Sequence, residues 1–181
     1  MDFIRLINQA KYDGELIFAF DDVADSLIIE NKLSTFRENS NKAVRVYLFC
    51  AYDPNGRYDT DFWLADIESV FKRLQILGKY QALPYLMRYD KYLDSPIAGL
   101  YKTLANYCNA AGFFKTSSFT QYCGNQLVNS RSKDKPCSRW RYYADFVRQY
   151  PHFETRFFSK RHWIPASAAK FHKEVTAHDK P

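Results

Sequence analysis

Three short apolar runs, each ending on a carboxylate, most constrain what this chain can fold into. They are 16-LIFAFDD-22, 44-VRVYLFCAYD-53 and 82-ALPYLMRYD-90, and all are rich in β-branched and aromatic residues. The stretches between them, about residues 24–38 and 60–78, have apolar residues at helical spacing. The order strand, helix, strand, helix, strand predicts parallel strands joined by helical crossovers. The second run is almost continuously apolar, which is typical of a strand buried on both faces.

The polar residues that follow these runs are the first candidates for a site. Ligands of open parallel sheets bind at the carboxyl ends of the strands, where Asp21, Tyr52, Asp53 and Tyr89 are expected. A second interpretation is structural, because an aspartate such as Asp22 that precedes a helix also serves as its N-cap. Both interpretations stay open at this point.

The chain divides into three parts by composition. Residues 1–123 are expected to form an α/β domain, a partial (βα) barrel-like unit with about three parallel strands and crossover helices. Residues 124–137, rich in Asn, Ser, Lys and Arg, are expected to be a linker. Residues 138–181 are expected to be a basic, aromatic, helical tail with one helix over 138–150, which ends before Pro151.

The net charge of +6 comes from this tail, since the residues before it are close to neutral. Cations that contact phosphates and aromatic rings that stack on bases are the two requirements of single-strand binding. The tail therefore offers a nucleic-acid-binding interpretation, with six candidate residues: Arg139, Trp140, Arg141, Lys160, Arg161 and Trp163. The alternative is an amphipathic helix that packs its aromatic face on the domain. We expect Trp140 to pack in this way and Trp163 to be exposed.

The cysteines do not predict a metal site. Cys50, Cys108, Cys123 and Cys137 are far apart, and no C-x-x-C pair occurs. The sequence also lacks an H-E-x-x-H helix and a G-x-S-x-G elbow, which argues against a metalloprotease or a serine hydrolase. No metal ligands are expected in this chain.

The amino-terminal segment MDFIRLINQAKYDG does not have the apolar core and small-residue cleavage site of a signal peptide. No run approaches the roughly 20 apolar residues that a membrane span needs. A cytoplasmic protein without a membrane partner is the expectation. A hydrophobic content of 46% predicts a folded core rather than a disordered chain.

Four motifs then occur in a fixed order: FAFDD at 18–22, RVYLFCAYD at 45–53 followed by YDTDFW, LPYLMRYDK at 83–91, and LANYCNAAGFFKTSSFTQY at 104–122. Together they resemble the C-terminal half of a radical S-adenosylmethionine (radical SAM) domain. The resemblance covers residues 16–123 and implies S-adenosylmethionine as the cofactor. It implies that the backbone of Met87, Arg88 and Tyr89 lies against adenine. It also implies that Asp21, Tyr52 and Asp53 lie near the ribose, the methionine or the substrate.

The sequence departs from this family in the residues that would bind the iron–sulfur cluster. The three-cysteine motif C-x-x-x-C-x-x-C is absent, and an iron–sulfur cluster needs such thiolates. The chain is therefore expected to be a fragment or split subunit that is not catalytic alone. Its expected partner is a chain that supplies the N-terminal half-barrel and the cluster cysteines.

Overall fold

The computed structural model describes residues 3–10, 14–128, 135–165 and 168. It has an α/β fold with these elements in order: α1 (Phe3–Gln9), β1 (Leu16–Ala19), η1 (Val23–Asp25), α2 (Ser26–Asn39), β2 (Val44–Cys50), α3 (Thr60–Lys79), β3 (Leu83–Arg88), η2 (Asp90–Asp94), α4 (Ala98–Asn109), α5 (Ala111–Thr116), α6 (Phe119–Gly124), α7 (Ser138–Gln149) and the π-helical turn η3 (Glu154–Phe158). Among these helices, none has both the length and the apolar character needed to cross a membrane.

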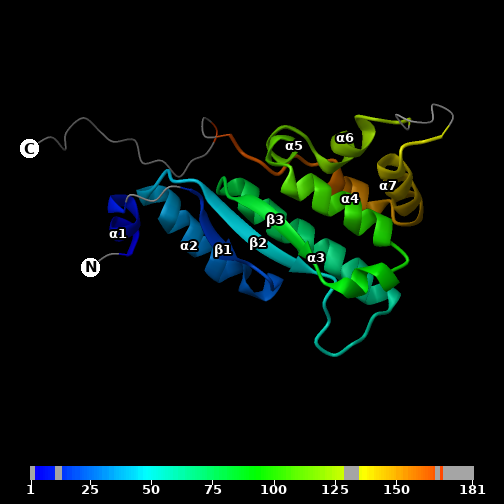
Figure 1. The fold of residues 1–181 in the computed structure, drawn as a ribbon, viewed down its shortest axis with the longest axis horizontal. Helices are drawn as coiled ribbons and strands as arrows, with labels where there is room; N and C mark the ends of the chain where they lie inside the picture. The colour runs from blue at the N-terminus through cyan, green and yellow to red at the C-terminus, as the bar shows by residue number, and fades with distance from the viewer. Residues whose placement is uncertain (1–2, 11–13, 129–134, 166–167, 169–181) are drawn as a thin grey trace, which may run out of the picture.

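The sheet has the order β1-β2-β3, and both strand pairs are parallel (Figure 1). Leu16 lies opposite Val44, and Tyr47 lies opposite Tyr85. Helix α2 connects β1 to β2, and α3 connects β2 to β3. The predicted parallel sheet with crossover helices is therefore confirmed.

Helix α3 forms where its apolar spacing predicts it. Ile67, Val70, Leu74 and Leu77 recur every three or four residues, and all four are fully buried. The carboxylate of Asp59 accepts a hydrogen bond from the backbone N–H of Phe62 at 2.8 Å and so caps the first turn. This helix contacts both β2 and β3 and forms the centre of the core.

Burial along β2 alternates instead of being continuous. Val44, Val46, Leu48 and Cys50 are buried, whereas the residues between them are only half-buried. The expectation of a strand buried on both faces is thus wrong. The reason is that α3 and α4 pack on one face of the sheet, and Phe36 of α2 contacts a side chain on that same face.

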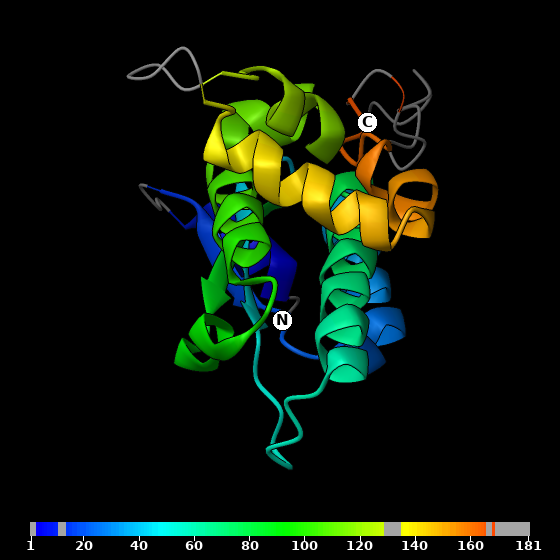
Figure 2. The same cartoon turned by 90° about the vertical axis from the view of Figure 1, so that its right-hand side faces the viewer.

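Side chains of residues 138–165, the main described part of the chain after the expected linker, belong to the same core. Helix α7, which confirms the helix predicted for 138–150, packs on α4 and α6 and crosses over α4 in Figure 2. Phe146, Phe153 and Phe158 are buried, and the ring of Phe158 lies 4.8 Å from that of Phe71 in α3. The aromatic side chains of this region therefore stabilise the α/β domain by packing against it.

The segment after η3 then returns to the end of α3. The backbone N–H of Ile164 donates to the carbonyl of Gly78 at 3.1 Å. Gly78 is buried, and a side chain on its Cα would overlap the carbonyl group of His162. This close backbone approach requires glycine at position 78.

Candidate functional site

The face of the sheet away from the helices carries an unusual number of exposed apolar side chains. Ile17 is 54% exposed, and the rings of Tyr47 and Tyr85 lie side by side with centroids 5.0 Å apart. The strand register places one set of residues on this open face: Ile17, Ala19, Arg45, Tyr47, Phe49, Leu83, Tyr85 and Met87. Parallel sheets are normally covered on both faces, so this face is the main candidate surface of the molecule.

Three aromatic rings meet at the carboxyl end of this face. Tyr52 and Tyr89 are in edge-to-face contact with centroids 5.2 Å apart, and the ring of Phe49 lies about equally close to both, at 5.8 and 6.0 Å. Tyr52 is 49% exposed, which leaves part of its ring available to a ligand. The structure therefore brings together two of the residues that the sequence predicted for the site.

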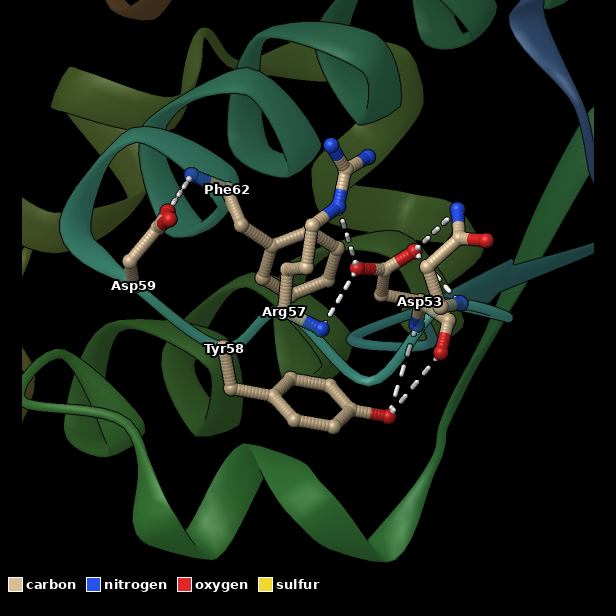
Figure 3. Close-up of polar contacts among 6 residues, drawn as sticks. Asp53, Arg57, Tyr58, Asp59 and Phe62 are labelled. Carbon is tan, nitrogen blue, oxygen red and sulfur yellow. Dashed lines mark hydrogen bonds and ion pairs between the residues drawn. The ribbon is translucent and has the colours of Figure 1, made fainter.

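Asp53 is bound within its own loop (Figure 3). Its carboxylate accepts hydrogen bonds from the backbone N–H groups of Asn55 at 3.0 Å and Arg57 at 2.7 Å. These backbone bonds, assisted by the Arg57 guanidinium 3.4 Å away, hold the pKa of Asp53 below its usual value. Its side chain is only 6% exposed. This carboxylate thus shapes the loop between β2 and α3, which projects from the body of the domain in Figures 1 and 2.

The two aspartates after β1 differ in role. Asp22 accepts a hydrogen bond from the N–H of Ala24 at 2.8 Å and is the N-cap of η1, as the structural interpretation predicts. The side chain of Asp21 is exposed, and its backbone carbonyl accepts from Arg73 at 3.1 Å. Asp21 therefore keeps a carboxylate at the carboxyl edge of the sheet.

The side chains of Met87, Arg88 and Tyr89, at the carboxyl end of β3, do not all face the same way. The register places Met87 on the open face, and the backbone carbonyl of Met87 accepts from the Cys50 thiol at 3.4 Å. Arg88 alternates to the helical side, where its guanidinium lies 4.5 Å from the ring centre of Tyr92. Of the predicted trio, the side chains of Met87 and Tyr89 border the open face, and that of Arg88 does not.

The sequence analysis missed a buried cation that supports this edge. Arg73 of α3 is 1% exposed and donates from one nitrogen to the carbonyls of Phe20 at 2.9 Å and Phe49 at 3.0 Å. Burial lowers its pKa. Because these carbonyls lie at the ends of β1 and β2, Arg73 fixes the geometry of both strand ends.

A buried carboxylate in the same helix, that of Asp66, fixes the chain directly after β2. Asp66 accepts hydrogen bonds from the N–H of Ala51 at 2.9 Å and the hydroxyl of Tyr101 at 2.7 Å. Burial raises its pKa, and these two hydrogen bonds oppose the shift. Ala51 has a positive φ of 63°, a conformation that few non-glycine residues adopt. Asp66 and Arg73 are seven residues apart and therefore lie on the same side of α3. Charged residues on the apolar side of a predicted helix are the sequence signal that indicates such a buried network.

The cysteines do not form a cluster site. Cys50, Cys108 and Cys123 are buried, and burial raises the pKa of each thiol. In the part of the chain that the structure describes, no group of three His, Cys, Asp or Glu side chains could hold a metal ion. These residues do not fit an iron–sulfur cluster, which requires accessible thiolates close together.

The six nucleic-acid candidates do not share one set of contacts. The guanidinium of Arg139 lies 4.3 Å from the ring of Tyr122, and that of Arg141 lies 5.1 Å from the ring of Tyr142. The ring of Trp140 lies 5.3 Å from that of Tyr143 in the same helix, and its half-buried indole packs against the core, as the packing interpretation predicts. Arg139 thus contacts a ring of α6, whereas Arg141 and Trp140 contact rings of α7 itself.

The last three candidates lie after η3. Lys160 is exposed, and Arg161 donates to the backbone carbonyl of Lys115 at 2.7 Å. Trp163 is half-buried rather than exposed, because its ring packs edge-on against Phe114. The ammonium group of Lys115 lies 5.1 Å from the centre of the indole. Lys115 was not among the predicted residues, because it is distant from the tail in sequence.

The two edges of the sheet differ in what lies beside them. At β3 the side-chain amide of Asn109 accepts from the N–H of Leu86 at 2.7 Å and donates to its carbonyl at 3.3 Å, as a neighbouring strand would. Beside β1 lies an apolar groove of about 620 Å³ between the strand and α2, lined by residues that include Phe18, Ile29, Leu33 and Phe36. One edge is thus closed by a side chain, and the other borders an open apolar groove.

Comparisons with known proteins give no relative. No family model, curated protein or solved structure matches this chain.

Proposed function

We propose that this chain is one part of a larger assembly of the radical SAM type. In this proposal it supplies the C-terminal wall of an S-adenosylmethionine site and is not catalytic by itself. The observation that carries the proposal is the one-sided sheet: helices pack on one face, and aromatic residues are exposed on the other.

The open face supports a partner that completes the sheet. Burying apolar surface contributes about 25 cal/mol per Å², so leaving Ile17, Tyr85 and Met87 in water forgoes several kcal/mol. Further parallel strands added at the β1 edge would extend the sheet, and curving it towards a barrel would enclose this face.

The two sheet edges support one direction for this partner. Because Asn109 already occupies the outer edge of β3, a further strand would pair with β1. Helix α2 exposes Leu27 and Ile28, which are 70% and 55% exposed, and borders the apolar groove beside β1. A strand followed by a helix, as in a βα unit, would fill the edge and the groove together. We therefore propose an N-terminal half-barrel as the occupant.

The proposed cofactor site contains fewer residues than the resemblance implies. Tyr52, Tyr89 and the backbone of Met87 remain as the wall for the adenosine, and Asp21 keeps an exposed carboxylate near it. Asp53 and Arg88 are engaged elsewhere and would act only by shaping the loop and the strand end. The cysteines that hold an iron–sulfur cluster would come from the partner, since those described here are dispersed.

The test is co-purification with a chain that carries C-x-x-x-C-x-x-C, followed by equilibrium dialysis of the anaerobic complex with S-adenosylmethionine. We expect Ile17→Lys to prevent the association, and Leu93→Lys, which alters an exposed leucine in η2, to leave it intact. Within the complex, Tyr89→Ala is expected to weaken binding of S-adenosylmethionine about tenfold, because a stacked ring is worth roughly 1–3 kcal/mol. Phe113→Ala, at an exposed ring of α5, is the control.

Two results would contradict the proposal. The first is an association that Ile17→Lys and Leu93→Lys affect equally, because the open face of β1 would then not be part of the contact. The second is an intact complex that binds no S-adenosylmethionine, which would leave a subunit interface without the proposed cofactor.

A further inference from the structure

A second pocket lies at the opposite end of the strands from the Tyr52–Tyr89 pair. It has a volume of about 370 Å³ and includes Val44 and Leu83, the first residues of β2 and β3. Its charged lining residues are all cations, Arg37, Lys42 and Lys115, and the indole of Trp163 forms another part of its wall. Of the residues that the structure describes, no carboxylate lines it.

Among the described residues, the hydrogen-bond partners of Arg37 include no counter-ion. Its guanidinium donates to the backbone carbonyls of Tyr80 at 2.7 Å, Lys42 at 2.7 Å and Gln81 at 3.0 Å. These neutral acceptors hold the group in place without neutralising it. Burial lowers its pKa, as expected for a cation held away from water.

Lys42 and Lys115 are likewise held by neutral groups. The ammonium of Lys42 donates to the carbonyls of Ile7 at 2.6 Å and Ala10 at 2.9 Å, at the end of α1. Lys115 lies over the face of Trp163, where the ring attracts the cation but carries no net charge.

Two carboxylates close to these residues in the sequence or across the sheet have other partners. Glu15 forms an ion pair with Arg45 at 2.5 Å. Glu38, next to Arg37 in α2, lies 3.4 Å from the hydroxyl of Ser34. Among the described residues, the pocket is therefore lined by three cations and no carboxylate, beside an aromatic face.

We propose that this pocket binds a phosphorylated nucleoside, with its base against Trp163 and its phosphate near Lys42 and Lys115. Lys side chains bind phosphates as point charges, and an indole provides a stacking surface for any base. A free nucleotide and one nucleotide of a single strand present the same chemistry. The proposal does not depend on the function proposed for the open face, because it uses different residues at the other end of the sheet.

The experiment is calorimetric titration of the full chain at low ionic strength with two probes, adenosine monophosphate and a ten-nucleotide single-stranded DNA. Lys115→Gln and Trp163→Leu are each expected to weaken binding at least about fivefold. The matched controls are Lys102→Gln, at an exposed lysine of α4, and Trp140→Leu, at the half-buried indole of α7. Urea unfolding of every variant separates lost binding from lost folding.

The outcomes distinguish the sources of the nucleotide. Equal affinity for both probes assigns the pocket to free nucleotides. Tighter binding of the oligonucleotide, with a salt slope of about −0.7 per phosphate neutralised, assigns it to single strands. The proposal is overturned if neither probe binds, or if Lys115→Gln binds like Lys102→Gln. Lys115 is exposed, so Lys115→Gln is expected to fold. Its comparison with Lys102→Gln therefore tests the proposal even if Trp163→Leu does not fold.

Discussion

The carbonyl group of His162 occupies the space beside the Cα atom of Gly78 in which a side chain would otherwise lie. A hydrogen bond from Ile164 to the carbonyl of Gly78 fixes the same contact. The end of the longest helix is thus joined to a segment more than eighty residues later in the chain. This contact ties residues 162–164 to the α/β core.

Gly78→Ala is expected to destabilise the protein, because its methyl group would overlap the backbone of His162. Overpacking of this kind typically costs 1–3 kcal/mol, and here backbone rather than a flexible side chain would have to move. Urea unfolding measures the effect. Gly112→Ala in α5 is the control, since a methyl group there meets no atom within 4 Å, and an equal loss in both variants would contradict the prediction.

His162 is expected to make stability depend on pH. Its ring is buried against Phe71, with Nε2 lacking a hydrogen-bond partner among the described residues. Burial, assisted by the charge of Lys160, lowers its pKa from 6.5 to about 4. Between these values the unfolded chain binds more protons, so acidification favours unfolding. The contribution of His162 is full above pH 6.5 and is lost as the pH falls towards 4.

The expected loss from this residue is about 2 kcal/mol between roughly pH 7.5 and pH 5. Urea unfolding at several pH values measures it, and His162→Gln is expected to flatten that part of the profile. His152→Gln, at an exposed histidine, is the control and should keep the slope of the original protein. A slope unchanged by His162→Gln would show that other groups carry the pH dependence.

Asn109→Ala is expected to cost about 1–2 kcal/mol, because the N–H and carbonyl of Leu86 would lose their side-chain partner. Hydrogen exchange at the amide of Leu86 should speed up at the same time. Asn106→Ala, at an exposed position one turn earlier in α4, provides the comparison. Unaltered exchange at Leu86 would show that the amide of Asn109 does not protect this edge.

A thiol reagent applied to the folded protein is expected to modify Cys137 first. The other three thiols are buried and have raised pKa values, so they offer little thiolate to the reagent. Mass spectrometry after brief alkylation identifies the modified residue, and the same treatment in urea should modify all four. Rapid native modification of Cys50, Cys108 or Cys123 would contradict the burial of these side chains.

The strands and the long helices could be predicted because their signals are local. Alternating or continuous apolar residues placed β1, β2 and β3 within about one or two residues of their observed ends. Asp22 as a helix cap was also foreseen, since a cap is recognised from its neighbours in the sequence.

The site was harder to predict because its contacts are made across the fold. The aromatic pair of Tyr52 and Tyr89 follows from two parallel strands ending together, and that inference needed only the strand order. By contrast, Arg73 reaches the ends of two strands through its side chain, and Lys115 meets Trp163 across 48 residues of sequence. Neither contact has a sequence pattern of its own. The exposure of one sheet face also depends on where every helix packs.

The amide of Asn109 has a consequence for polymerisation. A sheet with two free edges can add copies of itself head to tail without limit, which is how fibres grow. Here the amide blocks the β3 edge, so a second copy would meet this chain only through β1. Such an association is symmetric, and it pairs the free β1 edge of one copy with the free β1 edge of the other. The chain can therefore join one neighbour through β1, whereas growth of a fibre through β3 would require displacement of the Asn109 amide.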